Sequence, residues 1–229
     1  PDHFSELAPG VYRGGWADGY DISRALLPDM LERVPVRGRP VFMMPTRDVL
    51  LVTGDNDDEG LVAMVEFCLQ ALQHGRVVSA HMYHYEDREP LRYEPASPAL
   101  AHRLAHLARL LDKSEYDAQK EALDHIHEEQ GMDIFVAHYN LFTQEDDPAT
   151  SFSLASWTRG VDTSLPKVDR LALVRPDADD EIGEVRVVSW EQAVRVLEPL
   201  LAREVGYPIR YRTQGFPADA LLAQLNEVT

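Results

Sequence analysis

The chain has 229 residues, 45% of them apolar, and a formal net charge of -17 at pH 7, so it can build one large domain or two small ones with a buried core. The charge repels phosphate backbones and excludes a nucleic-acid partner. No apolar run is long enough to cross a bilayer, and the single cysteine, Cys68, excludes an internal disulfide. We therefore expect a cytoplasmic protein with no membrane partner, while a leader removed before Pro1 stays open.

The first third of the chain reads as a short helix, two apolar runs that form either a hairpin or one bent strand, and a longer helix. Residues 17–34 begin with an Asp-Gly turn and continue as a short helix that Pro28 can kink, with Asp21 placed to cap its first turn and with Leu26 and Leu27 on its apolar side. The elements expected next are strands over 40–45, 47–54 and 76–87, and a helix over 59–74 that stops at Gly75.

The middle of the chain has a different character. Two consecutive helices are expected over 97–113 and 114–131, the second opened by a capping box of Ser114 and Asp117 and closed by Gly131. The remaining third predicts strands over 133–142, 151–160, 165–174, 185–189 and 207–213, helices over 190–205 and 216–228, and acidic turns over 144–150 and 176–184.

Two stretches, 44–60 and 165–183, each place Pro-x-x-Asp before an apolar run and an acidic loop. The shared order predicts two related β-β-α-β units, each covering an apolar sheet face with its long helix; chance similarity is the alternative. We therefore predict an α+β protein with antiparallel or mixed strands packed on helices. Residues 1–95 would form the first unit, 96–131 a helical connector and 132–229 the second unit, unless all three make one continuous domain.

A familiar order of motifs occupies residues 18–93. The DGYD turn at 18–21 is followed by Ser-Arg, and the Pro-x-x-Asp step at 45–48 precedes an apolar strand. In this order the segment resembles the C-terminal part of the YtpQ-like family of uncharacterised bacterial proteins, a domain of unknown function. The loop at 55–59 is more acidic than the family pattern. The resemblance implies an intracellular α+β domain and no particular reaction.

The acidic loop after residue 54 has the residue spacing of a calcium-binding loop. However, an apolar strand enters it instead of a helix, and the copy that starts at Asp177 has Ile182 where glycine belongs. Calcium or magnesium binding therefore competes with a simpler role, in which the carboxylates favour the N-terminus of the following helix. The candidate metal ligands are Asp55, Asp57, Glu59 and Glu66.

Two polar groups are candidates for contacts with a ligand or partner. An arginine in a first helical turn opposes the helix dipole, so Arg24 needs Asp21, Asp48 or an anionic ligand beside it. In the second half, Trp157 stands near an arginine and an aspartate, which suits either a contact hot spot or a half-buried strand. The candidate contact residues are Asp18, Asp21, Arg24, Asp48, Trp157, Arg159 and Asp162.

Sequence motifs for nucleophilic catalysis, nucleotide phosphates and dinucleotides are absent from the chain. This favours a non-enzymatic protein-binding or regulatory domain that meets a protein partner through its acidic surface or exposed strands. One alternative is a metal-dependent hydrolase that uses carboxylates and histidines of the loops at Asp55 and Asp177. Another is a regulatory domain that binds a small ligand between the two units. No cofactor is expected beyond a calcium or magnesium ion, and the oligomeric state stays open.

Overall fold

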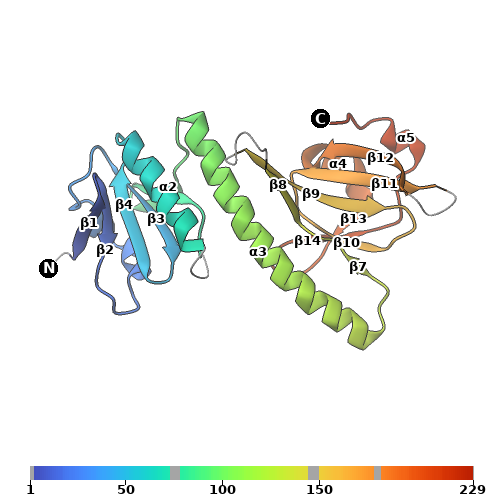
Figure 1. The fold of residues 1–229 in the computed structure, drawn as a ribbon, viewed down its shortest axis with the longest axis horizontal. Coiled ribbons are helices and arrows are strands. Elements are labelled where there is room, and N and C mark those ends of the chain that lie inside the picture. The colour runs from blue at the N-terminus through green and yellow to red at the C-terminus, as the bar shows by residue number, and fades with distance from the viewer. Residues whose placement is uncertain (1–2, 73–77, 144–149, 178–181, 229) are drawn as a thin grey trace. The chain divides into compact units, whose positions relative to one another are not determined.

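The computed structural model describes residues 3–72, 78–143, 150–177 and 182–228 (Figure 1). It mixes helices with antiparallel and parallel strands, which confirms the predicted α+β class. The chain divides into two compact units, Pro1–Leu111 (unit 1) and Asp112–Thr229 (unit 2). Within the described ranges, no helix combines the length and the apolar character that crossing a membrane requires.

Unit 1 is built on one six-stranded antiparallel sheet with strand order β1-β2-β4-β3-β5-β6. Of the two alternatives for the apolar runs, a hairpin or a bent strand, the structure has the hairpin, at the centre of the sheet. The elements are β1 (Phe4–Ala8), β2 (Val11–Gly14), η1 (Ile22–Leu26), α1 (Pro28–Leu31), β3 (Pro40–Thr46), β4 (Val49–Gly54), α2 (Asp58–Leu72), β5 (Met82–Glu86), β6 (Glu89–Arg92) and the first part of α3 (Pro98–Gln130).

Both faces of this sheet are covered, as the alternating side chains of β3 show. Val41 and Met43 belong to the core shared with Met64 and Cys68 of α2, whereas Phe42 between them belongs to a second core with Ala25 of η1. Helix α2 therefore covers one face, and the η1–α1 segment covers the other. The predicted stop at Gly75 lies outside the described residues.

The expected helix over 17–34 is wrong in its details. It is a 3₁₀ turn, η1, followed by the four-residue helix α1, and Asp21 makes no side-chain cap bond. Leu27 breaks the helix at φ -110° and ψ 81° because the proline after it disfavours the helical conformation. The break changes which side chains face the sheet: Ala25 and Leu31 are buried, whereas Leu26 and Leu27 are exposed.

The two helices predicted for the middle of the chain are one. Helix α3 runs without interruption from Pro98 to Gln130 and crosses the division between the units, so unit 1 holds its first part and unit 2 its second. Asp117 does not serve a capping box at Ser114; it accepts a hydrogen bond from Lys113 at 2.6 Å, one turn earlier. Such pairs four residues apart support a continuous helix. Gly131 ends it in the left-handed conformation, as predicted, at φ 63°.

Unit 2 contains two four-stranded sheets, with strand orders β13-β14-β10-β7 and β12-β11-β9-β8. Each sheet contains one parallel pair, β10–β7 and β9–β11. The elements are β7 (Phe135–Val136), β8 (Asn140–Thr143), β9 (Ser151–Thr158), β10 (Thr163–Pro166), β11 (Arg170–Pro176), β12 (Ile182–Ser189), α4 (Trp190–Leu197), η2 (Glu198–Leu200), β13 (Leu201–Arg203), β14 (Arg210–Thr213) and α5 (Asp219–Leu222).

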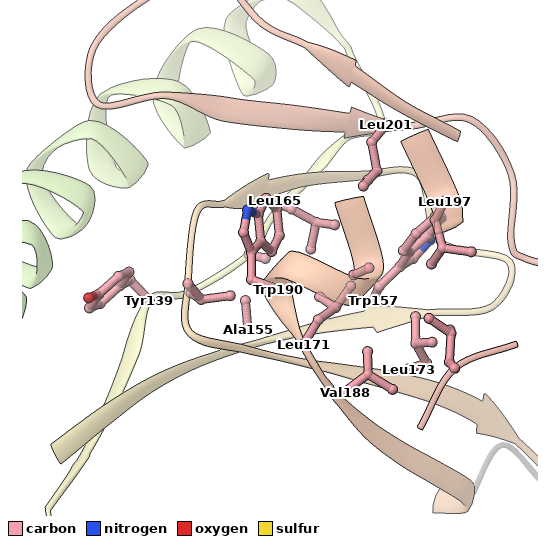
Figure 2. Packing of buried hydrophobic residues seen from close by; sticks show 14 of the residues in the cluster. Tyr139, Ala155, Trp157, Leu165, Leu171, Leu173, Val188, Trp190, Leu197 and Leu201 are labelled. Atoms are coloured by element: carbon pink, nitrogen blue, oxygen red, sulfur yellow. The ribbon is translucent and has the colours of Figure 1, made fainter. Parts of the chain in front are cut away.

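A single apolar core holds unit 2 together. Trp157 of β9, Leu171 of β11 and Leu197 of α4 are all fully buried in it, and Figure 2 shows them among the clustered side chains. Alternate residues of β9 point to this core, since Ser151, Ser153, Ala155 and Trp157 are buried and the residues between them are not. Ser189 starts α4 by accepting a hydrogen bond from the Gln192 backbone at 3.3 Å.

Several predicted elements of unit 2 are shorter than expected, including the helix over 216–228, of which only the four residues of α5 are helical. The strand over 133–142 is split between β7 and β8, and the strand over 165–174 between β10 and β11; in both cases the parts belong to different sheets. The helix over 190–205 ends at Leu197, because Pro199 follows and cannot continue a helical hydrogen-bond pattern. The acidic turn at 144–149 lies outside the described residues.

The two Pro-x-x-Asp stretches do not fold alike, so the expected repeat of β-β-α-β units is not supported. The first turns within one sheet, from β3 to its neighbour β4, whereas the second leads from β10 to β11 in the other sheet. A helix follows the first acidic loop, but strand β12 follows the second. Asp48 is exposed, while Asp169 accepts two hydrogen bonds at 2.7 Å, from the backbone and hydroxyl of Ser153.

Candidate functional site

A polar cluster in unit 1 surrounds Arg24, at the start of the η1–α1 segment. The guanidinium donates to both carboxylate oxygens of Asp18, at 2.9 and 2.6 Å, and lies 4.4 Å from the centre of the Trp16 ring. The hydrogen-bonded partner of Arg24 is therefore Asp18; the expectation that Asp21 or Asp48 would pair with it is wrong, although Asp21 adds a weaker electrostatic attraction. The paired fork and the stacked ring fix the orientation of this arginine.

This arrangement favours the negatively charged form of Asp18. The Arg24 side-chain hydrogen bonds, followed by the backbone bond from Tyr20, lower the pKa of Asp18 to about 2. Because the folded-state pKa is below its ordinary value, the stabilisation is present above the ordinary pKa and is lost only as the pH falls towards 2. The pair is thus intact at neutral pH.

Asp21 has a different environment from Asp18. Its side chain is 1% exposed, and one oxygen accepts a hydrogen bond from the Ala17 backbone at 3.3 Å. The other oxygen has no hydrogen-bond partner in the described part of the chain. Asp21 is therefore a buried side chain that holds the backbone of this loop. Asp48 lies on the exposed turn between β3 and β4 and is not brought to this cluster.

Three large apolar side chains next to this cluster face solvent. Tyr20 is 67% exposed, Leu26 72% and Leu27 49%. The segment that carries them is anchored to strand β5, since the Tyr85 hydroxyl donates to the Ala25 carbonyl oxygen at 2.7 Å. We call residues 16–27 the recognition loop. Its backbone is held in place while its apolar side chains point outward, an arrangement that suits contact with a partner.

Three of the four predicted metal ligands have another partner in the structure. Asp55 accepts hydrogen bonds from the backbone and the guanidinium of Arg39, at 2.8 and 3.0 Å. Asp57 is buried and accepts from the Gly60 backbone at 3.0 Å, in the first turn of α2. Glu59 is exposed in that turn, and Glu66 forms an ion pair with Arg103. In the described ranges, no three histidine, cysteine or acidic side chains come together as a metal would require.

The second predicted contact group is divided between the core and a surface hollow. Trp157 is fully buried, whereas Arg159 and Asp162 line an open hollow of about 770 Å³ in unit 2. Asp162 accepts two hydrogen bonds from Arg212, at 2.5 and 2.6 Å. The floor includes Phe216, whose ring packs edge-on against Trp157.

Several residues of both sites were missed from the sequence. Tyr20, Leu26 and Leu27 looked like ordinary turn and core positions, and only the break at Leu27 exposes the leucines. Arg212 lies 50 positions from Asp162, so no local spacing predicts their pairing. The one available signal was the Asp-Gly-Tyr turn, in which an aromatic residue follows a turn-forming pair.

Comparisons of the chain with protein-family models, with curated proteins and with solved structures each return no match. The resemblance of residues 18–93 to the YtpQ-like family therefore stays a prediction. Function has to be argued from the geometry of the recognition loop and the hollow.

Proposed function

We propose that the protein is a non-enzymatic binding domain whose recognition loop contacts a basic protein partner. The observation that carries the proposal is the exposure of Tyr20, Leu26 and Leu27 on an anchored segment. Burying such side chains in an interface is favourable by about 25 cal/mol per Å² of apolar surface. Because the segment is already ordered, little conformational entropy is lost on binding.

The residue types of the loop also support a protein contact. Tyrosine, tryptophan and arginine are the side chains most enriched at interface hot spots, and Tyr20, Trp16 and Arg24 occur together here. The Asp18–Arg24 pair supplies a polar border to the apolar side chains. A basic partner is favoured because the chain carries a net charge of -17, which attracts positive proteins and opposes pairing with a second copy.

The earlier expectation of contacts through exposed strands has less support. One of the two edge strands of the unit 1 sheet, β6, is fully exposed, but it contains Pro90 and the charged residues Glu89 and Arg92. Proline and charges on an edge strand hinder the addition of another strand. The recognition loop is therefore the better candidate for the contact.

The metal-dependent hydrolase is the weaker hypothesis. A calcium or magnesium ion at Asp55 would have to displace both hydrogen bonds from Arg39. Asp57 would have to give up its bond to the first turn of α2. Both losses would cost stability before any metal ligand formed. A cytoplasmic location belongs to the proposal too, since the single cysteine, Cys68, is free and buried, so no internal disulfide holds the fold.

The test compares Leu26→Asp with Val205→Asp in the full chain. Both positions are exposed, at 72% and 107%, so neither change should alter stability by more than about 0.5 kcal/mol. The tagged chain is incubated with a cell extract, and the proteins that it retains are identified. The basic protein among them is then purified, and its affinity for each variant is measured by calorimetry. We expect Leu26→Asp to weaken binding about thirtyfold, the effect of losing one hot-spot side chain, and Val205→Asp to leave it unchanged.

Two results would contradict this proposal. Equal binding by the Leu26→Asp variant and the unmodified chain would show that the partner contacts another surface. The second result is self-association of the unmodified chain, detected by sedimentation and abolished by Leu26→Asp. The recognition loop would then bind a second copy of the chain instead of a basic protein.

A further inference from the structure

The hollow in unit 2 is formed by two segments that are distant in the sequence. Residues 159–162 follow β9, and residues 212–216 include the end of β14. Gly160 and Gly215 both line it in the left-handed conformation, with φ of 85° and 84°, and a side chain built on either would meet nothing within 4 Å. The walls are thus open backbone turns, which leave room for a small molecule.

The hollow carries a positive charge in a strongly acidic chain. Arg212 is neutralised by Asp162, which holds it by two hydrogen bonds. Arg159 is exposed, and its side chain makes no hydrogen bond or ion pair with the described residues. Asp219, whose pKa Arg159 helps to lower, is engaged by Arg175. Counting Arg159, Arg212 and Asp162 leaves one net positive charge in the lining.

Two apolar side chains also line the hollow. Phe216 lines the hollow, and its ring is supported by Trp157 at a centroid distance of 5.9 Å and an interplanar angle of 73°. Val161, which is 39% exposed, adds apolar surface at the rim. A ligand can therefore place an apolar body on Phe216 and Val161 while an anionic group reaches the free fork of Arg159.

We propose that this hollow binds a small monoanionic carboxylate with an apolar body. A carboxylate matches the planar fork of arginine and the single excess charge of the lining. A phosphate dianion fits less well, because its second charge would stand next to Asp162 without a matching cation. The site is separate from the recognition loop and does not depend on the function proposed for it.

Benzoate is the probe for this site, with benzamide as its uncharged analogue and inorganic phosphate as the dianion. Binding to the full chain is followed by calorimetry and by the NMR signal of the Trp157 indole, which packs against Phe216. We expect saturable benzoate binding at millimolar concentration, with benzamide and phosphate weaker. Arg159→Gln should weaken benzoate binding at least about tenfold, since it removes a charged hydrogen bond.

The matched control is Arg195→Gln, which removes the same charge from an exposed position on α4. It should leave the benzoate affinity within about twofold of the unmodified chain, because an exposed charge away from the hollow is screened. The proposal is overturned if benzoate shows no saturable binding, if Arg159→Gln binds as well as the unmodified chain, or if both variants lose the same affinity. Equal binding of benzamide, or tighter binding of phosphate, would also overturn it.

Discussion

Replacing Arg210 by methionine is expected to lower the free energy of unfolding of unit 2 by about 4 kcal/mol. The side chain is 2% exposed and donates to Gln119 at 2.7 Å and to the carbonyl oxygens of Ala137 and Ser164, each at 3.0 Å. Burial lowers the pKa of this arginine, a sign of a desolvated cation. Methionine fills much of the volume but leaves the Ala137 carbonyl oxygen and the Gln119 side-chain oxygen without the donor that Arg210 supplies.

Arg212→Met is the matched control for this change. Arg212 lies two residues further along β14, but its side chain is 24% exposed and pairs with an exposed acid, so its loss should cost about 1 kcal/mol or less. Unfolding is followed by urea titration of Trp157 and Trp190 fluorescence in a Trp16→Phe background, so that unit 2 alone is observed. Equal losses from both variants would contradict the role assigned to Arg210.

The second large effect is expected from Asp169→Ala, which should lower the free energy of unfolding of unit 2 by about 2 kcal/mol. Asp169 accepts two hydrogen bonds from Ser153 and donates its backbone N–H to the same hydroxyl at 2.9 Å. These bonds join the starts of the parallel strands β9 and β11. The change would leave a buried serine without its partner.

Asp48→Ala provides the comparison, because Asp48 occupies the same place in the first Pro-x-x-Asp stretch. That residue is exposed on a hairpin turn, so the loss should be within about 0.5 kcal/mol. Urea titration of each variant measures both effects. Equal losses at Asp48 and Asp169 would mean that the two stretches are structurally equivalent, which contradicts their different topologies.

Local patterns in the sequence were sufficient for much of the fold. The β3–β4 hairpin, helix α2 and the strand character of β9 and β12 follow from apolar periodicity and turn residues. Strands β1 and β2 were missed because their short, mixed sequences carry little alternation, and β1 is mostly exposed. The long helix α3 was divided in two because Ser114 resembles a helix start, whereas continuous i, i+4 pairing keeps it helical.

The two Pro-x-x-Asp stretches show what the sequence alone leaves undetermined. Both Pro-x-x-Asp stretches turn the chain between strands, but whether those strands pair with each other depends on partners elsewhere in the sequence. The candidate sites show the same limitation. Asp18 and Arg24 were both singled out, yet their pairing depends on the path of the loop between them. Arg212 and Phe216 reach the hollow only through the folding of unit 2.

The most direct test of the central claim is photo-crosslinking from the recognition loop in living cells that express the full chain. Benzoylphenylalanine replaces Tyr20 in one variant and Tyr207 in the other, since both tyrosines are exposed, at 67% and 76%. We predict a crosslink to a basic protein from position 20 that is absent from position 207. The same crosslinked proteins from both positions, or none from position 20, would contradict the assignment of the recognition loop as the binding surface.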